Sequence, residues 1–244
     1  MSDSQSVTWA AHVRTLCLIY ELPDPLSLLQ NEDAWSKTAW KNWCSTKVTS
    51  YHERLWRDKA SSNSKMIYLN IQLAGLTGRH HPALSGLETS RDVERLRPHI
   101  KMLAGDYLTY SRIALENVSA DPSCRICRHT KPSQPSPPET VAHILTECTG
   151  TAEIRERMFP ELLNILLTVQ PNHAYLTCPP LINNLNHTLT QFLLDCSSFN
   201  LAPQYRINIS NTRIQDMFKV SRDICWAAHS SRKTKLKILK ARSK

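Results

Sequence analysis

Cys124-Arg-Ile-Cys127 and His143-Ile-Leu-Thr-Glu-Cys148 are the two stretches that decide the fold of this chain. They place two thiols three positions apart, and then an imidazole and a thiol five positions apart. These side chains are the ligands of a closed, tetrahedral, structural zinc site. A short turn brings both thiols of the first stretch toward one ion at little entropic cost. The predicted zinc ligands are Cys124, Cys127, His143 and Cys148.

The second ligand pair needs a local departure from a regular helix. Positions five apart are separated by about 140° on an ideal helix, because one turn takes about 3.6 residues. His143 and Cys148 therefore converge only if the helix loosens or ends near Cys148, and Gly150 is suited to ending it. Pro137-Pro138-Glu139-Thr140 predicts the start of this helix, with an acid near the positive end of the dipole.

A site with four protein ligands leaves no open position for an activated water, which argues against zinc-dependent hydrolysis. A redox-active C-x-x-C usually follows a strand, whereas the turn residues 119–123 precede this one. A chance grouping among eight cysteines and ten histidines is the other alternative. The remaining cysteines lack an activating motif and are expected to be small core residues: Cys17, Cys44, Cys178, Cys196 and Cys225.

The composition favours a helical protein. The 244 residues are 41% hydrophobic and 21% charged, which is ordinary for a globular chain of one or two domains. Five glycines are few for a turn-rich sandwich or barrel. We predict a mostly α fold with little or no sheet. Neither a secretory segment nor a membrane span is evident, so we expect an intracellular protein, nuclear or cytoplasmic, with reduced thiols.

The positive charge is concentrated at the carboxyl end. Residues 232–244 carry seven basic side chains and no acid, and subtracting these seven from the net charge of +9 leaves +2. A basic tail suits sequence-independent phosphate contacts, but it could also be a solvated, partly disordered end or a nuclear-localisation stretch. The predicted nucleic-acid contacts are Arg125, Arg128, Lys131, Arg232, Lys233, Lys235, Lys237 and Lys240.

Apolar spacing predicts a series of helices. They cover residues 9–20, a Trp-rich segment after Asp33, residues 90–103, 152–169, 181–196 and 212–228, and a short one at 26–30. Ser90 and Glu94 suggest a loose capping box. Pro98 is expected to kink its helix or break it into two, and Pro160 is expected to break its helix. Residues 65–73 alternate partly and suggest an extended segment, while 200–209 and the Pro-rich insert 131–138 read as loops.

Four of the six tryptophans lie close together, at Trp35, Trp40, Trp43 and Trp56. Beside basic residues they could form a platform for base stacking, although tryptophans on such a helix are more often core. The whole pattern divides the chain into four parts. These are a helical linker-like region (1–88), a helix with the zinc knuckle (89–170), a helical region (171–231) and a basic tail (232–244).

Three stretches resemble the end of the non-LTR retrotransposon reverse transcriptases. They are Ile100-Lys-Met-Leu-Ala-Gly-Asp-Tyr-Leu-Thr109, Cys124-Arg-Ile-Cys127 and Glu139-Thr-Val-Ala-His-Ile-Leu-Thr-Glu-Cys148. Residues 20–29 with 40–43 are similar to that family's helical linker, and 192–196 and 218–229 to its extreme carboxyl end. The resemblance implies a zinc knuckle with the same four ligands, gripping template RNA or target DNA beside a polymerase. The Pro-rich insert departs from the family's more compact knuckle.

The catalytic parts of such an enzyme have no counterpart in this sequence. It contains no Tyr-x-Asp-Asp or comparable pair of carboxylates, and no endonuclease motif. We therefore expect a non-enzymatic, zinc-binding fragment or gene relic whose partners are RNA or DNA and a polymerase part, without a small-molecule substrate or a membrane. The alternative is a zinc-stapled protein-interaction adaptor. An integrase-type enzyme is disfavoured, because no acidic triad follows His80-His81.

Overall fold

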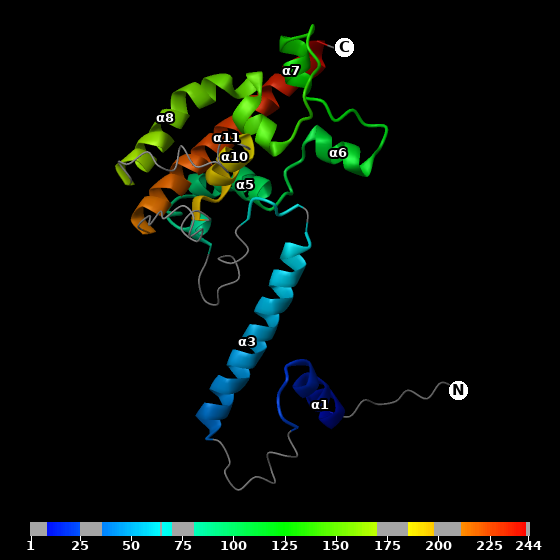
Figure 1. Cartoon of the computed structure of the whole chain (residues 1–244), viewed down its shortest axis with the longest axis vertical. Helices are drawn as coiled ribbons and strands as arrows, with labels where there is room; N and C mark the ends of the chain where they lie inside the picture. Colours follow the sequence, from blue (N-terminus) through cyan, green and yellow to red (C-terminus); the bar gives the residue numbers. More distant parts are fainter. Residues whose placement is uncertain are drawn as a thin grey trace, which may run out of the picture. The chain divides into compact units, whose positions relative to one another are not determined.

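Helices make up most of the described chain (Figure 1). The computed structural model describes residues 9–24, 36–63, 65–69, 81–169, 185–197 and 211–242. Within these ranges no strand occurs, and an isolated antiparallel bridge joins Ser123 to Pro138. The prediction of a mostly α fold with little or no sheet is confirmed.

The chain forms two compact units. The first consists mainly of the residues up to Ser62, and the second mainly of the residues from Asn63 onward. The four-part division expected from the sequence stays a prediction. No helix in the described ranges combines the length and apolar character that crossing a bilayer requires.

The first unit contains helices α1 (Trp9–Ile19) and α3 (Lys37–Ser61). The Tyr20 ring meets the Tyr51 ring edge-on at 5.2 Å, and Glu21 pairs with Lys47. The cap of α3 is Ser36, whose Oγ accepts from the backbone N–H of Ala39. Asp33, Trp35 and the expected helix at 26–30 lie outside the described residues. The other three tryptophans of this region are half-buried, so neither interpretation of them is settled: Trp40, Trp43 and Trp56.

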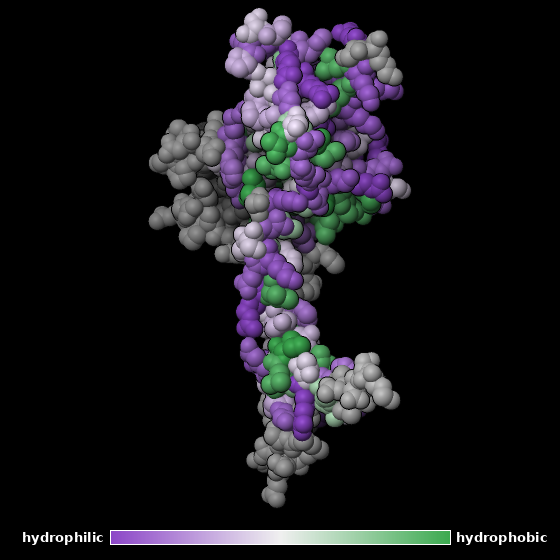
Figure 2. Space-filling model, turned by 90° about the vertical axis from the view of Figure 1, so that its right-hand side faces the viewer, coloured by the Kyte–Doolittle hydropathy of each residue, from purple (hydrophilic) through white to green (hydrophobic). Residues whose placement is uncertain are grey.

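The core of the second unit lies around α11 (Asn211–Arg242), which packs against α5 (Ser90–Leu103) and α8 (Ala152–Val169). Helix α10 (Leu185–Leu194) completes this core by packing against α11 and α5. The fully buried side chains of this core include Met102, Leu193, Leu194, Met217 and Phe218. On the face drawn in Figure 2, hydrophobic residues form separate groups among hydrophilic ones.

The start of α5 differs from its prediction. The capping box is formed by Thr89 and Asp92, not by Ser90 and Glu94. The Thr89 side chain accepts from the N–H of Asp92, and the Asp92 carboxylate accepts from the N–H of Thr89. This pair has the three-residue spacing that a reciprocal capping box needs, and the predicted pair did not.

Two prolines expected to interrupt helices do not divide them. Helix α5 continues through Pro98 and α8 continues through Pro160. A proline inside a helix removes one backbone hydrogen bond, at a cost of about 3 kcal/mol. Pro98 is buried, so its ring contributes to the packing that offsets this cost. The predicted break at Pro160 is therefore wrong, and so is the break that is one of the two alternatives for Pro98.

The remaining expectations are met in part. Helix α10 begins at Leu185, and residues 170–184 and 198–210 lie outside the described ranges. Helix α11 is longer than expected, because it continues through the basic residues to Arg242. Residues 65–69 form turns rather than an extended segment. Three of the other cysteines are buried as predicted, namely Cys17, Cys196 and Cys225, whereas Cys44 is partly exposed and Cys178 is not described.

Candidate metal centre

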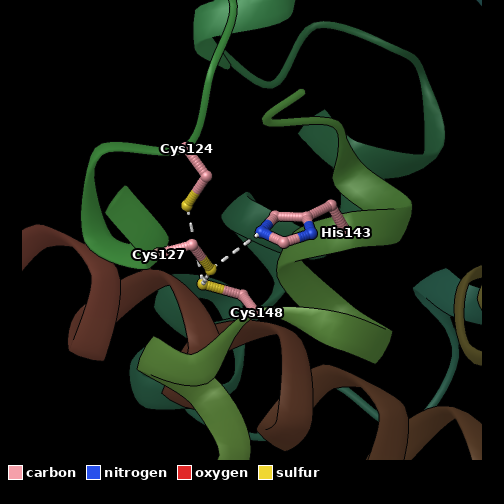
Figure 3. Close-up of side chains that lie close together, drawn as sticks. All are labelled: Cys124, Cys127, His143 and Cys148. Carbon is pink, nitrogen blue, oxygen red and sulfur yellow. Dashed lines mark hydrogen bonds between the residues drawn. The ribbon is translucent and has the colours of Figure 1, made fainter. Parts of the chain in front are cut away.

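The four predicted ligands meet in one buried cluster (Figure 3). Cys124 precedes the short helix α7 (Arg125–Thr130), and Cys127 lies within it. His143 opens the π-helical segment η2 (His143–Glu147), and Cys148 follows that segment directly. All four side chains are at least 93% buried, and their ligand atoms lie within 4.8 Å of one another.

The distances within the cluster are those of atoms arranged around a common centre. Cys148 Sγ lies 3.7 Å from Cys124 Sγ and 3.8 Å from Cys127 Sγ. Cys127 Sγ lies 3.3 Å from His143 Nε2. A disulfide would bring two sulfurs to about 2.05 Å, and all these cysteines are free thiols. The three thiols and the imidazole are therefore four separate groups that could bind one metal ion.

A π turn brings His143 and Cys148 together. The backbone N–H of Cys148 donates to the carbonyl of His143 at 2.7 Å, a bond that spans five residues instead of four. This wider turn closes the angle that a regular helix would open between the two side chains. The prediction that the helix loosens near Cys148 is confirmed.

Gly150 does not have the role predicted for it. The π-helical segment ends at Glu147, and Gly150 lies inside the following 3₁₀ turn η3 (Thr149–Thr151), which leads into α8, so Gly150 ends no helix. A Cβ at this position would lie 2.7 Å from Cγ2 of Ile126. The missing side chain is what allows η3 to approach α7 closely.

Of the residues expected to begin the helix that carries His143, Thr140 does so and Glu139 does not. Thr140 Oγ1 caps it by accepting from the backbone N–H of His143 at 3.0 Å. Glu139 does not serve this helix. Its Oε1 accepts from the N–H of Tyr110 at the start of α6 (Tyr110–Glu116) and pairs with Arg232 at 2.6 Å. The predicted dipole role of Glu139 is therefore wrong.

The end of the Pro-rich insert pairs with the segment that carries the first ligand. The N–H of Cys124 donates to the carbonyl of Pro137, and the N–H of Glu139 donates to the carbonyl of Pro122, both at 2.8 Å. The Ser136 hydroxyl donates to the carbonyl of Cys124 at 2.7 Å. Residues 131–135 are exposed as expected, while the end of the insert holds Cys124 in place.

The imidazole of His143 is oriented by a carboxylate. Its Nδ1 lies 3.3 Å from Glu147 Oε2, and the Asn186 side chain of α10 donates to the same carboxylate. Nδ1–H donates to Glu147, so Nε2 is the ring nitrogen that faces the sulfurs. A carboxylate placed in this way is what fixes the ring orientation and tautomer in metal-binding histidines.

The proximity of these groups shifts their pKa values strongly. Hydrogen bonding from Cys148 lowers the pKa of Cys124 to about 3, and the same interaction raises the pKa of Cys148. Burial acts to lower the pKa of His143, but the interaction with Cys124 outweighs it and raises this pKa to about 9. The protein groups thus share protons among themselves, and a cation binding here would replace those protons.

Comparison with known proteins found no matching family, no matching curated protein and no matching solved structure. The character of the centre is therefore argued from its geometry. A buried cluster of three cysteines and one histidine, with an oriented imidazole, is compatible with a bound metal ion.

Four of the eight predicted nucleic-acid contacts line one cleft beside the metal centre. This basic cleft has a volume of about 980 Å³ and lies between α7 and the last turns of α11. The four are Arg125, Arg128, Lys237 and Lys240, and the other lining residues are Tyr110, Asp121, His129, Pro132, Leu236 and Leu239. Figure 1 shows the end of α11 beside α7.

The other four predicted contacts lie elsewhere. Arg232 is partly buried and pairs with Glu139, and Lys235 Nζ donates to the carbonyl of Gly150 at 2.6 Å. Lys131 lines a smaller hollow next to Cys127 and His143. Lys233 is exposed on α11 and does not line the basic cleft.

Sequence reasoning missed the apolar side of the basic tail. Leu236 and Leu239 pack against the buried cluster of Cys124, Ile126, Cys127 and Cys148. Their three-residue spacing is a helical signal that could have indicated an amphipathic helix. A partly disordered end is excluded for residues 232–242, because they continue α11. No sequence signal pointed to the burial of Glu139.

Proposed function

We propose that this protein is a structural zinc module that binds nucleic acid and has no catalytic chemistry of its own. The observation that carries the zinc assignment is the spacing of the ligand atoms. Zn–S bonds of about 2.3 Å and Zn–N bonds of about 2.0 Å place tetrahedral ligands about 3.5–3.8 Å apart. The separations of 3.3, 3.7 and 3.8 Å fit this polyhedron.

The last turns of α11, which line the basic cleft, also contact the metal centre. This contact would link zinc binding to nucleic-acid binding. Ser231 Oγ and Lys235 Nζ both donate to the carbonyl of Gly150, two residues beyond Cys148. Leu236 and Leu239 cover the ligand cluster from α11. Cations from the knuckle and from the carboxyl end are thereby held on one surface, where a phosphate backbone can meet them together.

The resemblance to the carboxyl end of non-LTR retrotransposon reverse transcriptases stays a prediction. It accords with a chain that binds template or target through a zinc knuckle while the polymerase is supplied by another part. On this proposal the site is closed, because all four ligands come from the protein and none is left to water.

Metal analysis of the purified full chain tests the zinc assignment. We expect one zinc ion per chain in the native protein and in Cys44→Ser, a matched control at a partly exposed cysteine of the first unit. Cys127→Ser should lose the metal, because three ligands hold zinc far less tightly than four. Equal zinc content in Cys127→Ser and Cys44→Ser would remove the assignment.

Salt dependence tests the nucleic-acid assignment. Affinity for RNA or DNA should fall linearly on a log–log plot against salt, with a slope that reports the number of phosphate contacts. Zinc-free protein should bind more weakly, because the basic cleft loses the support of the cluster. Absent binding, or an affinity independent of salt, would contradict this part of the proposal.

A protein-interaction adaptor is the second candidate, and exposed apolar residues favour it. Leu115 of α6 is 86% exposed, and Val118 just after that helix is 96% exposed. Side chains of this kind mark contact surfaces when they gather on one side of a molecule. An association that survives nuclease treatment and is lost in Leu115→Ser would support the adaptor, and one lost with nuclease would not.

A further inference from the structure

The basic cleft combines unpaired cations with apolar side chains. No carboxylate among the described residues pairs with Arg125, Lys237 or Lys240. The one acid that lines the cleft, Asp121, pairs with Arg128. The lining is therefore complementary to a polyanion.

The apolar side chains lie on the inner side of this cleft. Leu236 and Leu239 are partly buried against the ligand cluster, whereas Lys237 and Lys240 of the same helix are exposed. Pro132 from the start of the Pro-rich insert adds a further apolar surface. A bound polyanion that uses only its charge would leave these side chains facing water.

Tyr110 fixes the position of one of the cations. The Arg125 guanidinium lies 4.5 Å from the centre of the Tyr110 ring, and the Arg232 guanidinium lies 5.9 Å from the same ring. Such cation–π contacts restrain a long side chain that would otherwise lose rotamer entropy on binding. Arg125 is thus held in place before a ligand arrives.

We propose that the basic cleft holds a single strand of nucleic acid, with its phosphates on the cations and its bases against the apolar side. This inference rests on the proposed nucleic-acid function and specifies its ligand. Proteins that bind single strands combine a positively charged groove with aromatic side chains on which unpaired bases stack. In this cleft the Tyr110 ring and the apolar Leu236, Leu239 and Pro132 would receive the bases. A duplex keeps its bases stacked inside, so it would use the cations alone and gain nothing from Leu236, Leu239 or Pro132.

The test compares single-stranded and duplex oligonucleotides of equal length on the zinc-loaded full chain by fluorescence anisotropy. A single strand of uridines or thymidines should bind at least about tenfold more tightly than a mixed-sequence duplex at the same salt. Lys237→Ala should weaken single-strand binding several-fold and lower the salt slope by about one contact. Lys233→Ala, one turn away and outside the cleft, is the matched control and should change little.

The apolar side is tested separately with Leu236→Ala. This variant should weaken single-strand binding and leave duplex binding unchanged, and its zinc content shows whether the cluster is intact. Duplex binding as tight as single-strand binding, or an equal loss of both in Leu236→Ala with zinc retained, overturns the single-strand proposal while nucleic-acid binding stands. If neither form binds, the proposed function itself fails.

Discussion

Glu139 is a buried carboxylate that connects three segments around the metal centre. It lies between the two ligand pairs in sequence, accepts from the backbone of Tyr110 and pairs with Arg232 of α11. The Glu139 side chain is fully buried, and that of Arg232 is 14% exposed. Removing one member of such a pair leaves a charge that water cannot reach, so the pair is costly to break.

Glu139→Gln should therefore destabilise the zinc-loaded protein by about 3 kcal/mol. Glu116→Gln is the control, because Glu116 pairs with Arg112 while 68% exposed, and its loss should cost no more than about 0.5 kcal/mol. Denaturant unfolding measures both values. If Glu139→Gln and Glu116→Gln are equally stable, the pair of Glu139 and Arg232 contributes no more than a surface contact.

Gly150 shows how closely two segments approach at the centre. Gly150→Ala would bring its Cβ to 2.7 Å from Ile126 Cγ2, and overpacking of this kind costs about 1–3 kcal/mol. Because Cys148 Sγ lies 3.4 Å from the same Cβ position, we expect faster loss of zinc to a chelator as well. A Gly150→Ala protein as stable as the native one would contradict the close approach.

At the scale of elements, His99 connects α5 to the end of α10. Its Nε2 donates to the carbonyl of Leu194 at 2.8 Å, and the side chain is fully buried. The pKa of His99 is lowered to about 4, mainly by burial and in smaller part by His81 and Arg222, while the hydrogen bond to Leu194 and the charge of Asp195 act to raise it. The folded state therefore holds the neutral imidazole in a pH range where the unfolded chain takes up a proton.

This difference predicts a pH dependence with a defined sign. Below the unfolded pKa of about 6.5 the unfolded chain binds more protons, so stability should fall as the pH drops toward about 4. The slope from this one group is at most about 1.4 kcal/mol per pH unit. His99→Gln should flatten the profile in that window, whereas His129→Gln, at an exposed position, should not. Identical profiles for His99→Gln and the native protein would refute the assignment.

Helix α11 connects the helical core to the metal centre and the basic cleft. Its middle packs on α5 and α8, and its last turns pack on α7 and η3. One face of those last turns covers the ligand cluster with Leu236 and Leu239, and the other presents Lys237 and Lys240. The basic residues therefore belong to the folded second unit.

At the scale of the whole molecule, metal removal should affect the two units differently. Chelation should loosen α7, η2, η3 and the last turns of α11, because the ligand cluster holds these segments together. Helices α1 and α3 belong to the first compact unit and should keep their protection. Hydrogen exchange measured with and without chelator, followed by zinc addition, reports both regions. Uniform loss of protection in both units would contradict this division.

The sequence by itself determined most of the helices and the candidate ligands. Helical spacing identified most of the described helices, and the residue types and spacings identified Cys124, Cys127, His143 and Cys148. These features are local: a ligand set follows from side-chain chemistry, and a helix follows from the positions of apolar residues. The loosened helix before Cys148 could also be predicted, because the ligand spacing requires it.

Only the tertiary structure decided which distant residues contact one another and where the basic residues lie. Pro98 and Pro160 stay within continuous helices, Gly150 allows a close approach, and Glu139 pairs with a residue of α11 far away in sequence. The same holds for the basic residues, of which some are bound to the protein itself and others line a cleft. Such outcomes depend on contacts between segments distant in the chain, where packing and burial outweigh local preference, and no local pattern encodes them.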